Sequence, residues 1–150
     1  MNLKDKINED LKNSMKSGDK VRLETIRSIR ALILEFEKSG TDKELTPEDE
    51  IRMLTSAAKK RKESIEQFRA GNRPELADKE ETELKIIEEY LPKQLSTAEI
   101  EVEIKKIALE VGAKTKEDFP KLMPIAAKAL KGKADGKVIK EIVEKILGSN

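Results

Sequence analysis

The chain has 150 residues, of which 41% are charged, and its 31 basic and 30 acidic side chains leave a net charge of +1. This balance indicates no global preference for a polyanionic partner. Histidine and cysteine are both absent. Their absence excludes disulfides, thiol nucleophiles, Ser-His-Asp triads and zinc sites built from His or Cys.

The amino-terminal residues 1–20 mix both signs of charge and contain no apolar run of signal-peptide length. No stretch approaches the roughly 20 apolar residues of a membrane-spanning helix. We therefore expect a soluble, cytoplasmic protein with no membrane segment.

Helical periodicity begins at the amino terminus. The first predicted helix has an apolar stripe that runs from Leu3 to Met15 in steps of four, and Gly18 ends it. Asp19 can cap a second helix, which we expect to end near Gly40. The apolar stripe of this second helix consists of Leu23, Ile26, Ile29, Ile33 and Phe36.

The third helix is the longest that the pattern predicts, from about residue 47 to residue 70. Thr46 precedes Pro47 and two acids, which is typical of a helix start. Arg61 lies on the apolar stripe of this helix, where an apolar residue was expected. Gly71 ends the third helix, and Pro74 opens a fourth that reaches Leu91.

Pro92 marks the predicted domain boundary, because it stops one helix and a capping box at residues 96–99 starts the next. Further helices are expected up to Gly112, over residues 119–130, and over residues 137–147. Pro124 should kink or split the middle one. The sequence thus predicts an all-α fold: an N-terminal four-helix bundle (1–93) followed by a C-terminal three-helix tail domain (94–150).

Residues 114–140 are locally basic, with eight lysines against three acids, a local charge of +5. Within them, residues 131–137 (KGKADGK) form a turn that feeds a helix. Gly132 and Gly136 permit positive φ and a close approach of ligand to backbone. The free amides of the next helix would then form an anion site among lysines. In the competing interpretation, the loop is ordinary and Asp135 caps that helix, which would leave RNA contact to side chains alone.

Arginines give a second set of candidates. Arg61 either pairs with an acid across the bundle, which we favour, or reaches a ligand. Arg22 and Arg27 invite the same structural interpretation, and Arg73 stands in a helix–helix turn. The aromatic content of 3% leaves few platforms for base stacking, so any RNA contact should be to phosphate and shape.

Common catalytic and nucleotide-binding patterns are missing. Neither G-x-x-x-x-G-K-[ST] nor G-x-G-x-x-G occurs. Paired carboxylates are frequent, but none stands out in an apolar run that would shift its pKa. We therefore predict no catalytic residue, no metal site and no cofactor.

Four blocks of sequence resemble the GatB/YqeY family. They read KRKESIEQF (60–68), GNRPELA (71–77), EYLPKQLS (89–96) and KGKADGK (131–137), and they follow the family's order nearly end to end. The family is related to the tail of the B subunit of aspartyl/glutamyl-tRNA amidotransferase, and similar modules are appended to some glutaminyl-tRNA synthetases. The resemblance implies an all-α fold and tRNA binding that supports aminoacylation or transamidation.

Carried onto this chain, the resemblance assigns tRNA contact to the carboxy-terminal turn, with two arginines matching the family's Arg-Leu-x-x-Leu/Ile-Arg pattern. These candidates are Lys131, Gly132, Lys133, Asp135, Gly136 and Lys137, with Arg22 and Arg27; Lys140 joins them because it keeps the same face basic. Three positions depart from the family. Pro120 and Pro124 stand where many relatives have glycine, and Lys140 stands where asparagine is usual.

Three functions follow as hypotheses. The first is a tRNA-binding accessory module that works with an amidotransferase or an aminoacyl-tRNA synthetase. The second is participation in carbon–nitrogen ligation with glutamine as the nitrogen donor. The third is a protein adaptor that docks a synthetase or ribosome-associated factor through its N-terminal bundle, without direct RNA contact. With no coiled-coil repeat and a high charge content, we expect a monomer.

Overall fold

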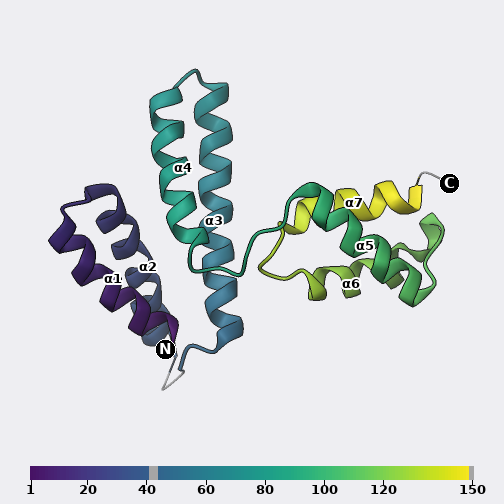
Figure 1. Cartoon of the computed structure of the whole chain (residues 1–150), viewed down its shortest axis with the longest axis horizontal. Coiled ribbons are helices and arrows are strands. Elements are labelled where there is room, and N and C mark those ends of the chain that lie inside the picture. Colours follow the sequence, from purple (N-terminus) through teal and green to yellow (C-terminus); the bar gives the residue numbers. More distant parts are fainter. Residues whose placement is uncertain (41–43, 149–150) are drawn as a thin grey trace. The chain divides into compact units, whose positions relative to one another are not determined.

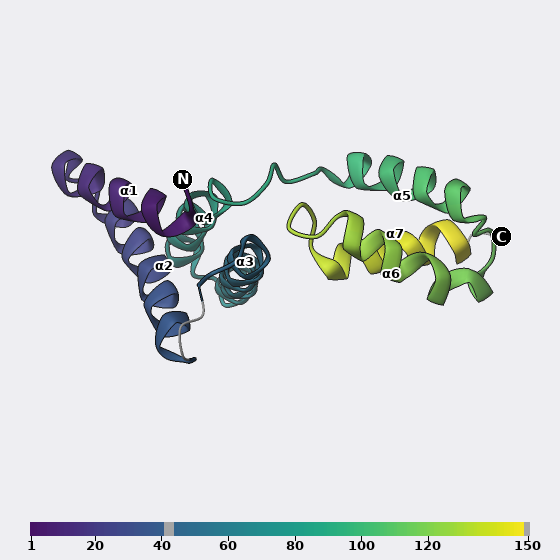
Figure 2. The same ribbon diagram turned by 90° about the horizontal axis from the view of Figure 1, so that it is seen from below.

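A computed structural model describes residues 1–40 and 44–148. Within this part of the chain all regular structure is helical, with seven α-helices and one 3₁₀ turn and no strand. The all-α class is therefore confirmed. The elements are α1 (Leu3–Ser17), α2 (Lys20–Lys38), α3 (Pro47–Ala70), α4 (Pro74–Glu88), α5 (Thr97–Val111), η1 (Lys116–Asp118), α6 (Phe119–Ala129) and α7 (Gly136–Gly148) (Figures 1 and 2).

The chain divides into two compact units, Met1–Pro92 and Lys93–Asn150. We call them unit 1, which contains α1 to α4, and unit 2, which contains α5 to α7. Each has a separate apolar core. Each unit therefore buries the apolar stripes of its helices against one another.

Unit 1 is built on a long antiparallel pair, α3 and α4, against which α2 packs, with α1 on α2 (Figure 1). Thr46 starts α3 with a reciprocal capping box, in which its hydroxyl accepts from the Asp49 amide and Asp49 accepts from the Thr46 amide. The fully buried side chains Ile7, Ile26 and Ile87 bring three of the helices into one core.

Unit 2 packs α5, α6 and α7 around one another. Ser96 and Glu99 form the capping box that opens α5, and Gly112 closes the helix at φ +71°. The hydrogen bonds from the Ser96 backbone and side chain lower the pKa of Glu99. Ile104, Leu122 and Val143, one from each helix, have no solvent exposure. They bring the three helices of unit 2 into one apolar core.

The predicted apolar stripe of α1 is wrong at Met15, and one of the two effects expected of Pro124 does not occur. Met15 is 58% exposed, whereas the neighbouring Ser14 is buried. A stripe that advances by four residues drifts around a helix of 3.6 residues per turn, so Met15 has rotated away from Leu3. Pro124 does not split its helix, since α6 runs through it from Phe119 to Ala129. Leu122 and Ala126 on either side of Pro124 are both fully buried, and this packing outweighs the helix-breaking tendency of proline.

Candidate nucleic-acid interface

The bend between α6 and α7 is a tight turn closed by its own backbone. The amides of Lys133 and Ala134 both donate to the carbonyl of Leu130, at 2.9 and 3.2 Å. Gly132 takes the left-handed conformation with φ +78°, which glycine adopts without the steric penalty of a Cβ. Leu130 is buried and anchors the turn in the core of unit 2. The glycine is therefore needed for the shape of the bend.

The residues that precede α5 cover the backbone of this bend. The Gln94 side-chain amide donates to the Gly132 carbonyl at 2.6 Å, and the Leu95 amide donates to the Lys133 carbonyl at 2.9 Å. Gly132 is buried as a result. The Gly132 carbonyl therefore already has an internal partner, and the approach of a ligand to this backbone stays a prediction. Gly136 is exposed, but it is not among the residues with positive φ.

Asp135 caps the last helix. Its Oδ1 accepts a hydrogen bond from the Lys137 amide at 3.0 Å, which is the arrangement of an N-cap carboxylate. The carboxylate also places negative charge at the positive end of the α7 dipole. The Asp135 carboxylate thus already lies at the first amides of α7, where the anion site was predicted. The structure therefore agrees with the competing interpretation, in which Asp135 caps the helix.

Four lysines surround the bend, and all of them are exposed. Lys131 and Lys133 lie in the turn, and Lys137 and Lys140 lie in the first turns of α7. Among residues 1–40 and 44–148, none of these four ammonium groups forms an ion pair. Their charges therefore remain available to an external anion.

The fold separates the basic segment 114–140 into two groups. Helix α6 separates the bend from a group of lysines near the other end of the helix. It is 11 residues or about 16 Å long. Figures 1 and 2 show the bend at the end of unit 2 where α5 begins. The separated lysines are Lys114, Lys116 and Lys121. On α7, Glu141 and Glu144 follow Lys140 within a turn or so and are exposed. The local charge of +5 is thus not one patch.

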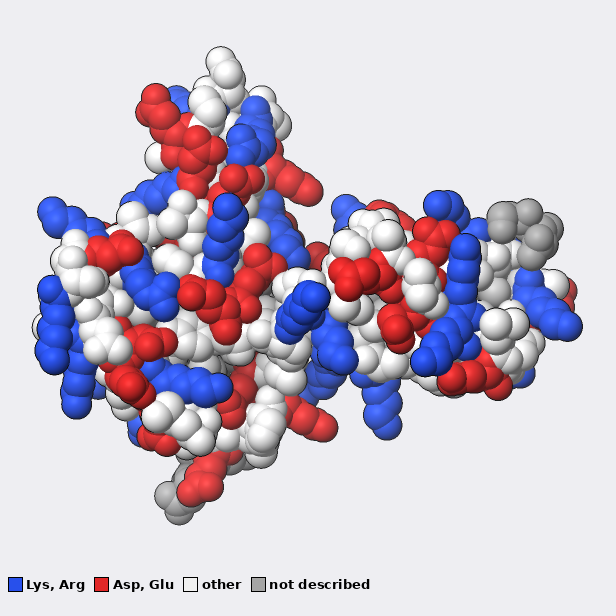
Figure 3. All heavy atoms as spheres, in the orientation of Figure 1, with Lys and Arg blue, Asp and Glu red and all other residues white. Residues whose placement is uncertain are grey.

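Positive and negative side chains are interspersed over the visible surface of each unit (Figure 3). The exposed positive charge at the bend is that of four lysines. Such a small group can orient a phosphate chain, but it gives little long-range attraction.

Arg22 forms an ion pair within unit 1. Its Nη1 lies 2.8 Å from Oε2 of Glu89, and the hydrogen bond to that carboxylate raises the pKa of Arg22. The neighbouring Tyr90 hydroxyl donates to Asp10 of α1. Burial, followed by this hydrogen bond, raises the pKa of Tyr90. These contacts tie α1 and α2 to the end of α4, which is a structural role.

Arg61 pairs with two acids of α4, as the structural interpretation predicted. Its Nε lies 3.3 Å from Glu83 Oε2 and 3.6 Å from Glu80 Oε2, and its side chain is 22% exposed. Desolvation, followed by repulsion from Glu83, raises the pKa of Glu80. One guanidinium therefore holds two neighbouring carboxylates together, and its charge is already compensated.

Arg27 and Arg73 are both exposed, and neither forms an ion pair within the described residues. Arg27 lies on α2, and Arg73 directly precedes α4. Both belong to unit 1, whereas the bend belongs to unit 2. Contact of Arg27 and Arg73 with RNA stays a prediction.

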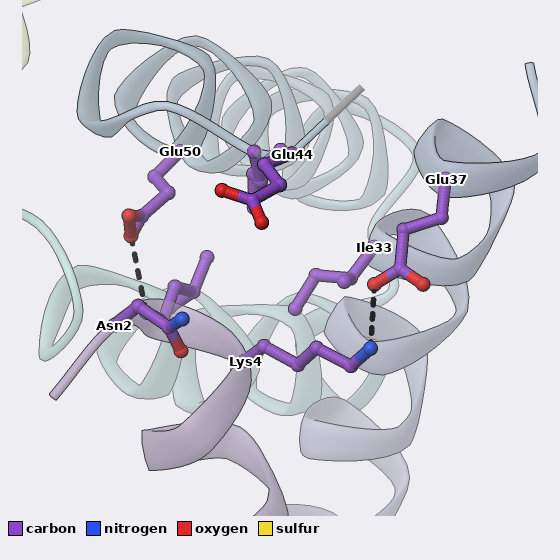
Figure 4. A pocket seen from close by; sticks show the side chains of 8 residues that line it. Asn2, Lys4, Ile33, Glu37, Glu44 and Glu50 are labelled. Atoms are coloured by element: carbon purple, nitrogen blue, oxygen red, sulfur yellow. Dashed lines mark hydrogen bonds and ion pairs between the residues drawn. The ribbon is translucent and has the colours of Figure 1, made fainter. Parts of the chain in front are cut away.

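Sequence reasoning missed a pocket of about 520 Å³ in unit 1 (Figure 4). Its charged lining is mostly acidic, but two of the carboxylates already have partners. Glu50 accepts from the Leu3 amide at 3.1 Å, and Glu37 pairs with Lys4 at 2.8 Å. The pocket thus belongs to the contacts that hold the start of α1. No single motif indicates it, since its lining comes from α1, α2, α3 and residues 44–45.

Two other classes of site were considered from the residue types present. Within residues 1–40 and 44–148, no group of three or more Asp and Glu residues is arranged to hold a metal ion. No helix in the described part of the chain has the length and apolarity that crossing a bilayer requires. The site with the best physical argument is the basic bend.

Fold and site together define a class: a two-unit, all-α protein with a lysine-rich bend in its second unit. Residues 4–147 match the family described as "Yqey-like protein", whose domain is of the GatB/YqeY type. The chain belongs to this family, as its sequence blocks predicted.

Curated relatives come from fungi. A protein of Pyrenophora tritici-repentis is 30% identical over 147 residues, which cover 96% of this chain and 80% of the relative. A protein of Candida glabrata is 32% identical over 130 residues, which cover 86% of this chain and 69% of the relative. Both are named "Altered inheritance of mitochondria protein 41, mitochondrial". An uncharacterised protein of Schizosaccharomyces pombe is 36% identical over 95 residues, which cover 63% of this chain and 76% of the relative.

These names correct one prediction. The expected cytoplasmic location is contradicted, because relatives that match most of the chain are named as mitochondrial proteins. The prediction depended on the composition of residues 1–20 and on the lack of an apolar stretch of membrane-spanning length. Charge pattern near an amino terminus is a weak guide to location.

Proposed function

We propose that the protein is a tRNA-binding accessory module that supports tRNA-dependent amidation or aminoacylation by a partner enzyme. The observation that carries the proposal is the set of four exposed lysines at the α6–α7 bend without an internal ion pair among the described residues. Lysine ammonium groups of this kind bind phosphate oxygens as point charges. Family membership adds the reason to test tRNA before other polyanions.

The proposed contact differs from the one that a free helix terminus would make. Asp135 already caps α7, and the Gly132 carbonyl is already hydrogen-bonded. RNA would therefore be held by side chains that project from a rigid turn. Contacts of this type position a backbone and carry little sequence information.

The proposal assigns a role to each part of the chain. Residues 94–150 would act as a GatB/YqeY-type tail domain of three helices that contacts tRNA. Residues 1–93 would act as a four-helix bundle that contributes no base-specific contact of its own. The partner would be a tRNA amidotransferase or an aminoacyl-tRNA synthetase, and the protein would act as a monomer without a cofactor.

Charge reversal tests this assignment. A triple variant, Lys131→Glu, Lys133→Glu and Lys137→Glu, should weaken binding to bulk tRNA by at least about tenfold, because it removes phosphate contacts and adds repulsion. Binding is measured by titrating labelled tRNA with the full chain at fixed salt.

The matched control reverses three lysines of unit 1 that are also exposed and unpaired within the described residues, Lys6, Lys12 and Lys20. Its net charge changes by the same amount, so general electrostatic attraction falls equally. Equal loss of affinity in both triple variants would contradict a specific role for the bend.

A further inference from the structure

Helix α5 exposes apolar side chains on the face that points away from its core. Val102 is 63% exposed and Leu109 is 85% exposed. They are seven residues apart, which is two helical turns or about 10.5 Å along one stripe. The opposite face of α5 buries Ile100, Ile104 and Ile107. The helix is therefore apolar on two faces, and one core explains only one of them.

A shallow groove of about 420 Å³ adjoins the carboxy-terminal part of this stripe. The side chains of Leu109 on α5 and of Ile146 and Leu147 on α7 contribute to its apolar surface, together with Ala108 and Ala113. Its two charged lining residues are Lys105 and Lys114. The groove is thus an apolar surface whose charged residues are all positive.

The charge at this surface selects among possible occupants. Lys105 lies between Val102 and Leu109 along the helix, and its internal partner is Glu101 at 3.3 Å. Both members of this i,i+4 pair are solvent-accessible, with 61% and 30% of their side chains exposed. Exposed pairs of this kind are weak, so an acid from a binding partner can replace Glu101.

A second copy of the chain is a poor occupant. If two α5 helices packed through the stripe antiparallel, with Val102 opposite Leu109, Lys105 would face the Lys106 of the copy. A parallel pair would place Lys105 opposite itself. Either arrangement brings like charges together at the centre of the contact, which is destabilising.

We propose that this surface, made of the α5 stripe and the α5–α7 groove, binds an amphipathic helix of a protein partner whose apolar side chains are flanked by acidic ones. The apolar anchors would enter the groove beside Leu109, and a carboxylate would meet Lys105. Helix-in-groove recognition of this kind uses anchors at i, i+4 and i+7. The surface involves none of the bend lysines, so it can be tested without RNA.

The experiment uses designed helical peptides of roughly 18 residues with leucine at i, i+4, i+7 and i+11. One set carries glutamate beside these positions, and a matched set carries lysine. The glutamate set should bind the full-length protein at least about tenfold more tightly than the lysine set. Amide chemical shifts should change along α5 and the carboxy-terminal half of α7.

Leu109→Asp should reduce the affinity for the glutamate set by at least about tenfold. Met15→Asp is its matched control, because Met15 and Leu109 are both exposed and both lie three residues before the glycine that ends a 15-residue helix. The cost of aspartate near a helix end is therefore the same in both. Lys105→Glu should reverse the preference between the two peptide sets.

Four results would overturn the proposal. The first is that no glutamate peptide saturates the protein. The second is that Leu109→Asp and Met15→Asp bind these peptides equally. The third is that lysine peptides bind the wild type as well as glutamate peptides do. The fourth is a concentration-dependent dimer that Leu109→Asp abolishes, which would assign the surface to a second copy.

Discussion

The arginines of unit 1 and the lysines of the α6–α7 bend are equally prominent in the sequence, yet the fold uses them differently. Arg22 and Arg61 lie within 2.8 to 3.6 Å of carboxylates on another segment of unit 1. Within the described residues the bend lysines have no such partner. A cationic side chain without an internal partner is therefore a stronger candidate contact for an external anion than one that is already held in a pair.

The largest loss of stability is expected when Arg61 is removed. Arg61→Ala should lower the free energy of unfolding of unit 1 by about 2 kcal/mol, because it leaves two partly buried carboxylates without their shared cation. It should not change tRNA affinity. Thermal or urea denaturation measures the first quantity, and tRNA titration measures the second.

Arg27→Ala serves as the control for Arg61→Ala, since Arg27 is exposed on α2 and unpaired in the part of the chain described. Its effect on stability should stay within about 0.5 kcal/mol. If Arg61→Ala leaves stability unchanged and weakens tRNA binding, the roles assigned to unit 1 and the bend are reversed.

A smaller effect is expected at Asp135. Asp135→Ala should destabilise unit 2 by about 1 kcal/mol, because α7 loses its cap. The same change should modestly raise tRNA affinity, since it removes a negative charge and frees the Lys137 amide. Asp135→Asn should raise affinity while keeping most of the stability, because asparagine also caps helices. A loss of tRNA affinity in both variants would show that Asp135 itself contacts the RNA.

The smallest effect concerns the response of unit 1 to pH. The pKa of Glu80 is raised by burial and by Glu83, so the folded state binds more protons than the unfolded chain in the range just above the ordinary value of 4.5. Glu80 therefore opposes folding increasingly as pH rises through that range, and the penalty is complete above its folded pKa.

Glu80→Gln should remove this dependence while Arg61 keeps Glu83. Melting temperatures of the variant and the wild type, compared between about pH 4 and pH 7, should shift in favour of the variant as pH rises. A shift in favour of the wild type would mean that the ion pair with Arg61 outweighs desolvation at Glu80.

Much of the helical architecture could be predicted because its signals are local. The capping boxes at Thr46 and Ser96, and the glycines that end α1 and α5, act within one turn of the residues that carry them. The all-α class followed from them. The partner of Arg61 was expected only as an acid across the bundle, since the pairing of α3 with α4 decides which acid faces it.

The candidate site was harder to predict because its contacts join residues that are far apart in sequence. The bend was found from Gly132 and its lysines, but Gln94, which covers it, is 38 residues away in sequence. The count of lysines over 114–140 treated as one patch what α6 divides into two. Leu109 lies opposite the buried stripe of α5, so periodicity predicts that it is exposed, but the groove beside it is completed by Ile146 and Leu147 of α7 and could not be predicted from α5 alone.

The salt dependence of tRNA binding measures whether the bend lysines neutralise phosphates. If the four bend lysines neutralise about four phosphates, log affinity should fall with log salt concentration with a slope of about −3 for the wild type. The slope should approach zero when Lys131, Lys133 and Lys137 are reversed. If the wild-type affinity does not change with salt, or if the triple variant has the same slope as the wild type, the bend lysines do not neutralise tRNA phosphates.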